Sequence, residues 1–147
     1  MSIIEAIRDY IMDYDKLTAN LPVWVNYIGA VPIEYNIVPI AGPVIEEEYI
    51  NGASIRSFPF ALQSVESTAD NLHRLQTMGF FEAFSEWLDQ QTVDKVLPTL
   101  SIGQTSRLIE TTGWAYLYKQ GFSETGIYQI QCRLQYRQVA LVLTPPE

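Results

Sequence analysis

Apolar side chains recur every three or four residues at the start of the chain, from Ile3 to Tyr14. This spacing predicts an amphipathic helix over residues 2–17. Ser2 is followed three residues later by a glutamate, which is the spacing of a capping box and favours a helix start at Ser2.

The next part of the chain alternates between apolar and polar residues and predicts strands. Residues 22–28 alternate with two partly apolar faces, which is typical of a first strand. Prolines and a glycine then interrupt the aliphatic residues of 31–48, so a continuous central strand is not expected there. We expect a strand near 33–38, followed by an exposed excursion.

The dipeptide Asn51-Gly52 is the strongest short-range signal in the chain. It is preferred in a two-residue type I′ turn, so we expect a hairpin here. Such a turn places Glu47 opposite Arg56, and an opposite-charge cross-strand pair contributes about 0.2–1 kcal/mol.

A long helical pattern follows, for which Ser67 and Thr68 are the expected N-caps. Gly79 interrupts it, so the stretch is either one helix with a close packing contact or two helices joined near residue 79. The positions expected on the core side are Leu72, Leu75, Phe80, Phe84, Trp87 and Leu88.

The last third of the chain predicts two strands, at 106–118 and 127–138, joined by a turn. In the second strand, apolar residues from Tyr128 to Tyr136 alternate with polar residues from Gln129 to Arg137, which indicates one buried and one wet face. Together the elements predict a single α+β domain over 1–147: a mainly antiparallel sheet with helices packed on one face, and a loose tail beyond about residue 143.

Composition narrows the function classes. The chain has 147 residues, with 9 Lys and Arg against 17 Asp and Glu, one histidine and one cysteine. One cysteine forms no internal disulfide, and together with one histidine it supplies too few ligands for a zinc site. The basic residues are scattered, so no specific nucleic-acid binding is expected. No apolar run approaches the roughly 20 residues of a membrane span, and the first residues lack a signal-peptide pattern.

No catalytic constellation emerges from the sequence. His73 is expected at the boundary of a helical apolar stripe, and Cys132 on the buried face of the last strand, where a thiol acts as a small hydrophobe. Nucleotide-binding, metalloprotease and hydrolase motifs are absent. We therefore expect a protein that is not an enzyme and needs no cofactor or metal.

Two local clusters have structural interpretations. Glu46, Glu47 and Glu48 are expected to form a solvated strand edge that blocks uncontrolled strand pairing. The alternating aromatic residues Trp114, Tyr116 and Tyr118 favour packing or subunit contact over base stacking, because the chain is acidic.

The excursion, with the aliphatic segment 37–45, is the best candidate for an interface. Its aliphatic residues lie among prolines and a glycine. A monomer gains little by burying such a loop, and exposed aliphatic side chains of this kind commonly contact a partner. The alternative is that the loop folds back over an end of its own sheet. The candidate subunit-interface residues, including the charged hairpin, are Ile37, Val38, Ile40, Val44, Ile45, Glu46, Glu47, Glu48 and Arg56.

The order and spacing of several segments resemble a known family. These segments are the pair Trp24 and Tyr27, residues 35–37 (Tyr-Asn-Ile), the hairpin at 49–55, residues 58–60 (Phe-Pro-Phe), the helical stretch 80–87, residues 97–100 (Leu-Pro-Thr-Leu) and the strand 128–136. The chain resembles the small tail-terminator and minor capsid (head–tail joining) proteins of long-tailed bacteriophages and Gram-positive prophages.

The resemblance implies a non-enzymatic virion protein, made in the bacterial host cytoplasm. Its partners would be further copies of itself in a hexameric ring, the tail-tube protein and the head-connector protein. A DNA channel needs little positive charge, so Glu46 and Glu48 are candidates for an acidic lumen. Two alternatives stay open: another head–tail joining or minor capsid protein, and a bacterial protein that binds a small ligand or partner.

Overall fold

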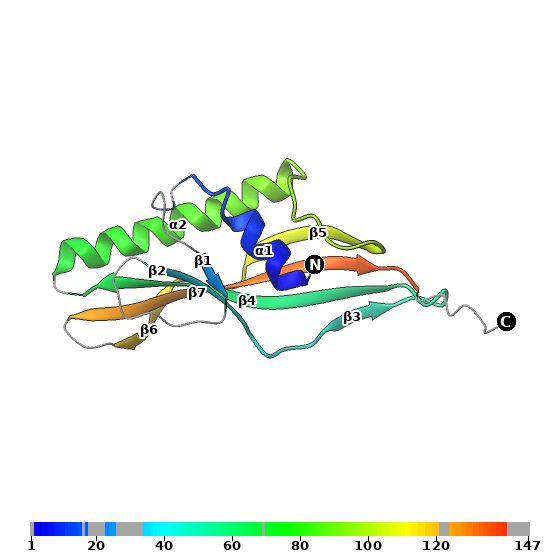
Figure 1. Ribbon diagram of the computed structural model, residues 1–147, viewed down its shortest axis with the longest axis horizontal. Coiled ribbons are helices and arrows are strands. Elements are labelled where there is room, and N and C mark those ends of the chain that lie inside the picture. Colours follow the sequence, from blue (N-terminus) through cyan, green and yellow to red (C-terminus); the bar gives the residue numbers. More distant parts are fainter. Residues whose placement is uncertain are drawn as a thin grey trace.

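The computed structural model describes residues 2–15, 17, 23–25, 34–68, 70–120 and 124–140 (Figure 1). Within these residues the chain forms helices and strands in the order α, four strands, α, three strands. Their bounds are α1 Ile3–Ile11, β1 Val23–Val25, β2 Glu34–Pro39, β3 Ile45–Glu48, β4 Ser54–Ser67, α2 Asn71–Val93, β5 Gln104–Thr111, β6 Tyr116–Gln120 and β7 Thr125–Gln138.

Two long strands, β4 and β7, form the middle of the sheet. They pair antiparallel along all 14 residues of each, from Ser54 opposite Gln138 to Ser67 opposite Thr125. The other edge of β4 pairs with β2 and β3, and the other edge of β7 pairs with β5 and β6. β1 adds to β2 in parallel, while the remaining pairs are antiparallel. This confirms the predicted α+β class.

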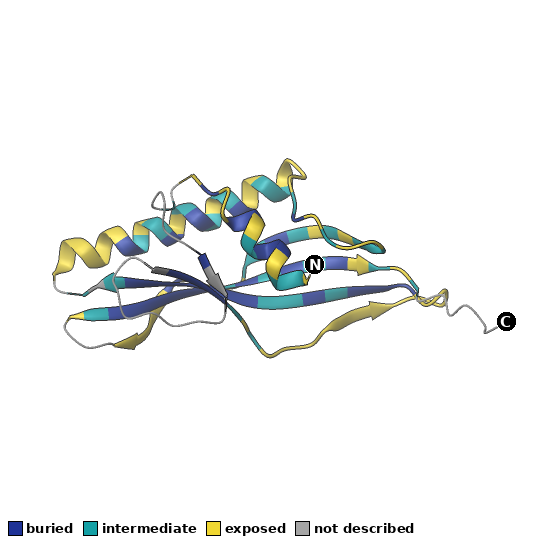
Figure 2. Cartoon of the chain, viewed as in Figure 1, coloured by how far each residue is buried: buried dark blue, intermediate teal, exposed yellow. Residues whose placement is uncertain are grey.

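Both described helices lie on one face of this sheet, and the core fills the space between (Figure 1). Alternate residues of β4 and β7 point toward the helices, as the period of two predicts. Figure 2 shows the resulting buried band along β4 and β7, with exposed residues on β3, β6 and the outer side of α2. The fully enclosed side chains on this face include Ile7, Ile11, Ile37, Phe60, Leu62, Phe81, Phe84, Leu88, Ile109, Cys132 and Leu134.

The first helix is shorter than the predicted 2–17. Ser2 is its N-cap, and the Ser2 side chain accepts a hydrogen bond from the Glu5 N–H at 3.2 Å. The helix ends at Ile11, after which Tyr14 N–H donates to Ile11 O in a tighter turn. This turn places the Tyr14 ring against aromatic side chains of α2, so the apolar spacing persists although the regular helix has ended.

The predicted hairpin is present, but its register differs by one residue. Gly52 N–H donates to Tyr49 O and Tyr49 N–H donates to Ala53 O, so the loop has three residues rather than two. Gly52 takes a positive φ of 87°, as in a type I turn followed by a bulge. Glu47 therefore lies opposite Ile55, and the expected pairing of Glu47 with Arg56 is wrong.

The second helix also differs from its prediction. It begins after the N-cap Asp70, because Ser67 still belongs to β4. It continues as one helix through Gly79, which is exposed and has no close packing contact. Leu72 and Leu75 are exposed, so their assignment to the core was wrong; Phe81, Phe84 and Leu88 form the buried stripe.

The predicted strand 106–118 is divided in two. Residues 112–115 form a break that leaves the ladder between β5 and β6. Because of this break, Trp114 lines a pocket with α2, whereas the Tyr116 hydroxyl accepts hydrogen bonds from Gln129 and Gln131 on the opposite face of β7. The predicted alternation of aromatic residues on one face is therefore wrong.

A polar ladder crosses the sheet face opposite the helices. Asn36 Nδ2 donates to Gln63 Oε1 at 3.2 Å, and Gln63 Nε2 donates to Gln129 Oε1 at 2.8 Å. Gln129 Nε2 then donates to the Tyr116 hydroxyl at 2.5 Å. Gln129 is buried, which corrects the expectation that this face of the last strand is wet throughout. The bonds link β2, β4, β7 and β6 and satisfy these buried amides.

Candidate functional site

Exposed apolar side chains gather at the end of the sheet that carries the β3–β4 hairpin. The ladders place Ser54, Gln104 and Gln138 side by side, so the loops before β4, before β5 and after β7 meet here. Ile50 and Ile102 are fully exposed, at 109% and 104%. We call this end of the sheet the hairpin-end surface, and it consists of the exposed apolar residues Tyr49, Ile50, Ile102 and Val139 together with the exposed Arg137.

The predicted interface residues of the excursion separate into two groups. Ile37 is fully buried on β2 beneath the helices and is closed to a partner, and Val38 is half-buried. Ile40 is half-buried, and its N–H donates to Pro59 O at 3.0 Å. Val44 and Ile45 are exposed. The Ser57 N–H also donates to Val44 O at 2.7 Å, so the backbone of the excursion is bonded to β4 at both ends, while the Val44 and Ile45 side chains face solvent.

The three predicted glutamates also differ from one another. Glu46 lies at a bulge between Ile45 and Glu47. Its carboxylate accepts hydrogen bonds from Arg133 Nη1 at 2.6 Å and from Gln135 Nε2 at 2.5 Å. Arg133 also pairs with Glu110 at 2.6 Å. Glu46 therefore connects β3 to β7 across the sheet face, which is a structural role.

The remaining charged candidates lie toward the hairpin. Glu47 and Glu48 are exposed along β3, as expected for a charged strand edge. Arg56 is half-buried, and its Nε donates to Ser54 Oγ at 3.0 Å. Of the charged hairpin, Glu47 and Glu48 are thus the side chains most open to a partner.

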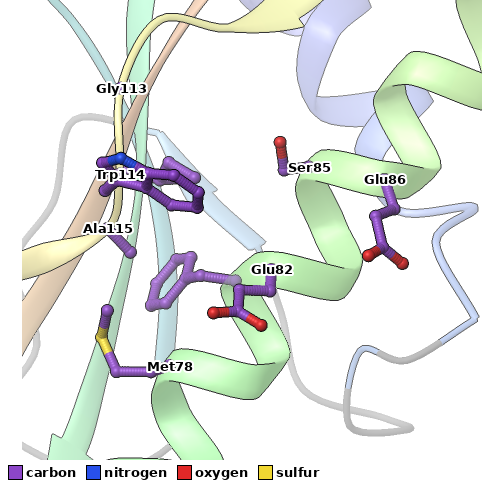
Figure 3. Close-up of a pocket in the computed structure, with 9 residues that line it drawn as sticks. Met78, Glu82, Ser85, Glu86, Gly113, Trp114 and Ala115 are labelled. Carbon is purple, nitrogen blue, oxygen red and sulfur yellow. The ribbon is translucent and has the colours of Figure 1, made fainter.

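A second candidate contact surface lies between α2 and the break at 112–115. Figure 3 shows Trp114 projecting from the break toward α2, with Ser85 and Glu82 on the nearest part of the helix and Glu86 farther along it. The space between them is a pocket of about 340 Å³. Trp114 is 81% exposed although it borders this pocket. We call it the α2–Trp114 groove, and its lining is Met78, Phe81, Glu82, Ser85, Glu86, Gly113, Trp114, Ala115 and Ile130.

The groove is polar on its helical side. Glu82 and Glu86 are four residues apart on α2, so both carboxylates stand on the same side of the helix. Ser85 is hydrogen-bonded to Thr111 at 2.7 Å between their hydroxyl oxygens, which fixes α2 against the end of β5. The groove thus combines an exposed indole, an apolar floor and two carboxylates.

The predicted chemical residues take structural positions. Cys132 is buried, and burial raises the pKa of its thiol, as expected for a small core hydrophobe. His73 is exposed, and its Nδ1 lies 2.9 Å from Asp70 Oδ1. The His73 backbone N–H also donates to Asp70 and is the main reason that the pKa of Asp70 lies below its ordinary value. Within the described ranges, no three His, Cys, Asp or Glu side chains are grouped to hold a metal.

Comparison of the chain with protein-family models and with curated proteins finds no match. Among the described helices, none combines the length and apolar character that a membrane crossing requires.

Sequence reasoning located the hairpin but missed most of the residues that make these surfaces. Ile50 lies beside the Asn51-Gly52 signal, so its position in the loop could have been inferred. Glu82 and Glu86 show helical spacing, but nothing local to them indicates that Trp114 faces the same side of α2. That proximity arises from the α2–β5 packing and from the break after Thr111.

Proposed function

We propose that this chain is a structural virion protein of the tail-terminator type. In this proposal, its copies form a ring that ends the tail tube and joins it to the head connector. The observation that carries the proposal is the presence of two separate candidate contact surfaces: the exposed apolar side chains of the hairpin-end surface, and the pocket of the α2–Trp114 groove with its exposed indole.

The geometry of a closed ring explains why two surfaces are needed. Each subunit of a ring contacts its neighbours head to tail, through two different and complementary patches. Large exposed apolar groups rimmed by polar residues commonly mark such contacts. The hairpin-end surface lies at one end of the sheet, whereas the groove lies beyond the far end of β5, so one copy presents both without covering either.

Electron microscopy of the concentrated protein tests this proposal. We expect ring-shaped particles for the wild-type chain and their loss in Ile50→Glu, because a carboxylate would be placed in the contact. Met12→Glu is the matched control: Met12 is an exposed apolar residue (52%) just beyond α1, outside both surfaces. Absence of rings from the wild type, or equal ring formation by both variants, would contradict the proposal.

A further inference from the structure

The α2–Trp114 groove has the chemistry of a site for a cationic side chain. An indole face attracts a guanidinium or ammonium group, and nearby carboxylates add charge-assisted hydrogen bonds. Glu82 and Glu86 make no ion pair within the described residues, so no cation offsets their charge. Two like charges four residues apart on a helix also repel one another. A bound cation would relieve this repulsion.

The same chain offers a suitable cation at its hairpin end. Arg133 is already held by two glutamates, and Arg8 pairs with Asp9. Arg137 is exposed and has no ion pair with any residue that the structure describes. It lies close to Val139 and to the loop that carries Ile102. An arginine with apolar neighbours matches a groove that has two acids and an apolar floor.

Arg137 does not reach the groove of its own chain. It pairs with Thr105, near the start of β5, whereas the groove begins after Thr111, at the other end of that strand. Six residues of extended strand cover about 20 Å at roughly 3.3 Å per residue. The complementary groups therefore meet between two copies and not within one.

We propose that the hairpin-end surface of one copy docks into the α2–Trp114 groove of the next. The Arg137 guanidinium lies against the Trp114 indole and pairs with Glu82 and Glu86, while Ile102 covers the apolar rim. This inference rests on the proposed function, since it names the two patches through which the ring closes.

A charge-exchange experiment in the full-length chain tests the contact by sedimentation. Glu82→Arg and Arg137→Glu should each weaken self-association about tenfold or more, and the double variant should recover most of the loss. Trp114→Ala should weaken it about tenfold. Arg8→Glu is the net-charge control for Arg137→Glu, since it makes the same change in charge on α1, outside both surfaces. Circular dichroism in the near ultraviolet checks that each variant keeps its packed core.

The possible outcomes distinguish failure of this proposed contact from failure of the proposed ring. Loss in both single variants with recovery in the double variant supports the contact. If the wild type associates and the single variants associate equally well, or if the double variant shows no recovery, the groove does not receive Arg137 and the proposed function stands. A wild-type chain that stays monomeric would overturn both.

Discussion

The Tyr14 hydroxyl is a buried polar group with no hydrogen-bond partner among the described residues. The Tyr14 ring packs against Phe80, Phe84 and Trp87 at centroid distances of 5.8, 5.4 and 5.0 Å. Burial is the main reason that the pKa of Tyr14 rises to about 12. The ring thus stabilises the α1–α2 packing, whereas the hydroxyl loses its hydrogen bonds to water on folding and gains none in their place, which is destabilising.

Tyr14→Phe should therefore raise the free energy of unfolding by about 1 kcal/mol, since it removes the unpaired hydroxyl and keeps the ring. Tyr10→Phe is the matched control, because the Tyr10 hydroxyl donates to Val96 O at 2.7 Å. Its loss should lower the free energy of unfolding by about 1 kcal/mol. Urea denaturation of both variants measures the difference; a loss of stability in Tyr14→Phe equal to that in Tyr10→Phe would show that the hydroxyl is satisfied.

Glu66 makes stability depend on pH. Burial of its carboxyl raises the pKa of Glu66, although the Ser64 hydroxyl donates to it at 2.5 Å and lowers that pKa in part. Because the folded-state pKa of Glu66 lies above its unfolded value, the stability that comes from keeping this carboxyl neutral is fully present below the unfolded pKa. The contribution is lost as the pH rises through the folded-state pKa.

Glu66→Gln should remove this loss, because the amide oxygen keeps the bond to Ser64 without a charge. Thermal melts from acid to neutral pH should show a smaller fall in melting temperature for Glu66→Gln than for the wild type. Glu47→Gln removes the same charge from an exposed position and is the control. Parallel pH profiles for the wild type and Glu66→Gln would rule out the effect.

At the scale of elements, two glycines have opposite roles. Gly79 lies inside α2 with open space around it, so Gly79→Ala should raise the free energy of unfolding by about 0.5–1 kcal/mol. Gly52 has a φ of 87°, and an added Cβ would lie 3.0 Å from the Ala140 Cβ. Gly52→Ala should therefore lower the free energy of unfolding by about 1–2 kcal/mol. Chemical denaturation of the pair tests both signs, and two changes of the same sign would contradict this account.

The same elements show which features of the fold could be predicted from the sequence. Alternation from Tyr128 to Tyr136 predicted the buried face of β7 correctly, because a strand paired on both edges keeps its period of two. The turn signal at Gly52 predicted a hairpin but not its three-residue loop, since both loop lengths use a glycine with positive φ. Leu72 and Leu75 followed helical spacing, yet residues 71–76 at the start of α2 are all exposed, and local spacing does not indicate which turns of a helix are covered by the rest of the fold.

At the scale of the whole molecule, the sequence predicted the fold class, but the candidate surfaces required the topology. The groove needs the middle of α2 to lie against the end of β5, and residues 112–115 to leave the ladder at that point. The hairpin-end surface needs loops around residues 50, 102 and 139 to meet, which follows from the pairing of β4, β7 and β5. Such long-range pairings decide which exposed residues become neighbours.

Whether the chain closes into a ring by itself is best decided by the native mass of the purified wild-type protein. Light scattering over a wide range of concentration and salt requires no partner and no variant. We expect a closed assembly, and a hexamer of 16.7 kDa subunits would have a mass of about 100 kDa. A mass of 16.7 kDa at every concentration would contradict head-to-tail closure through the two surfaces.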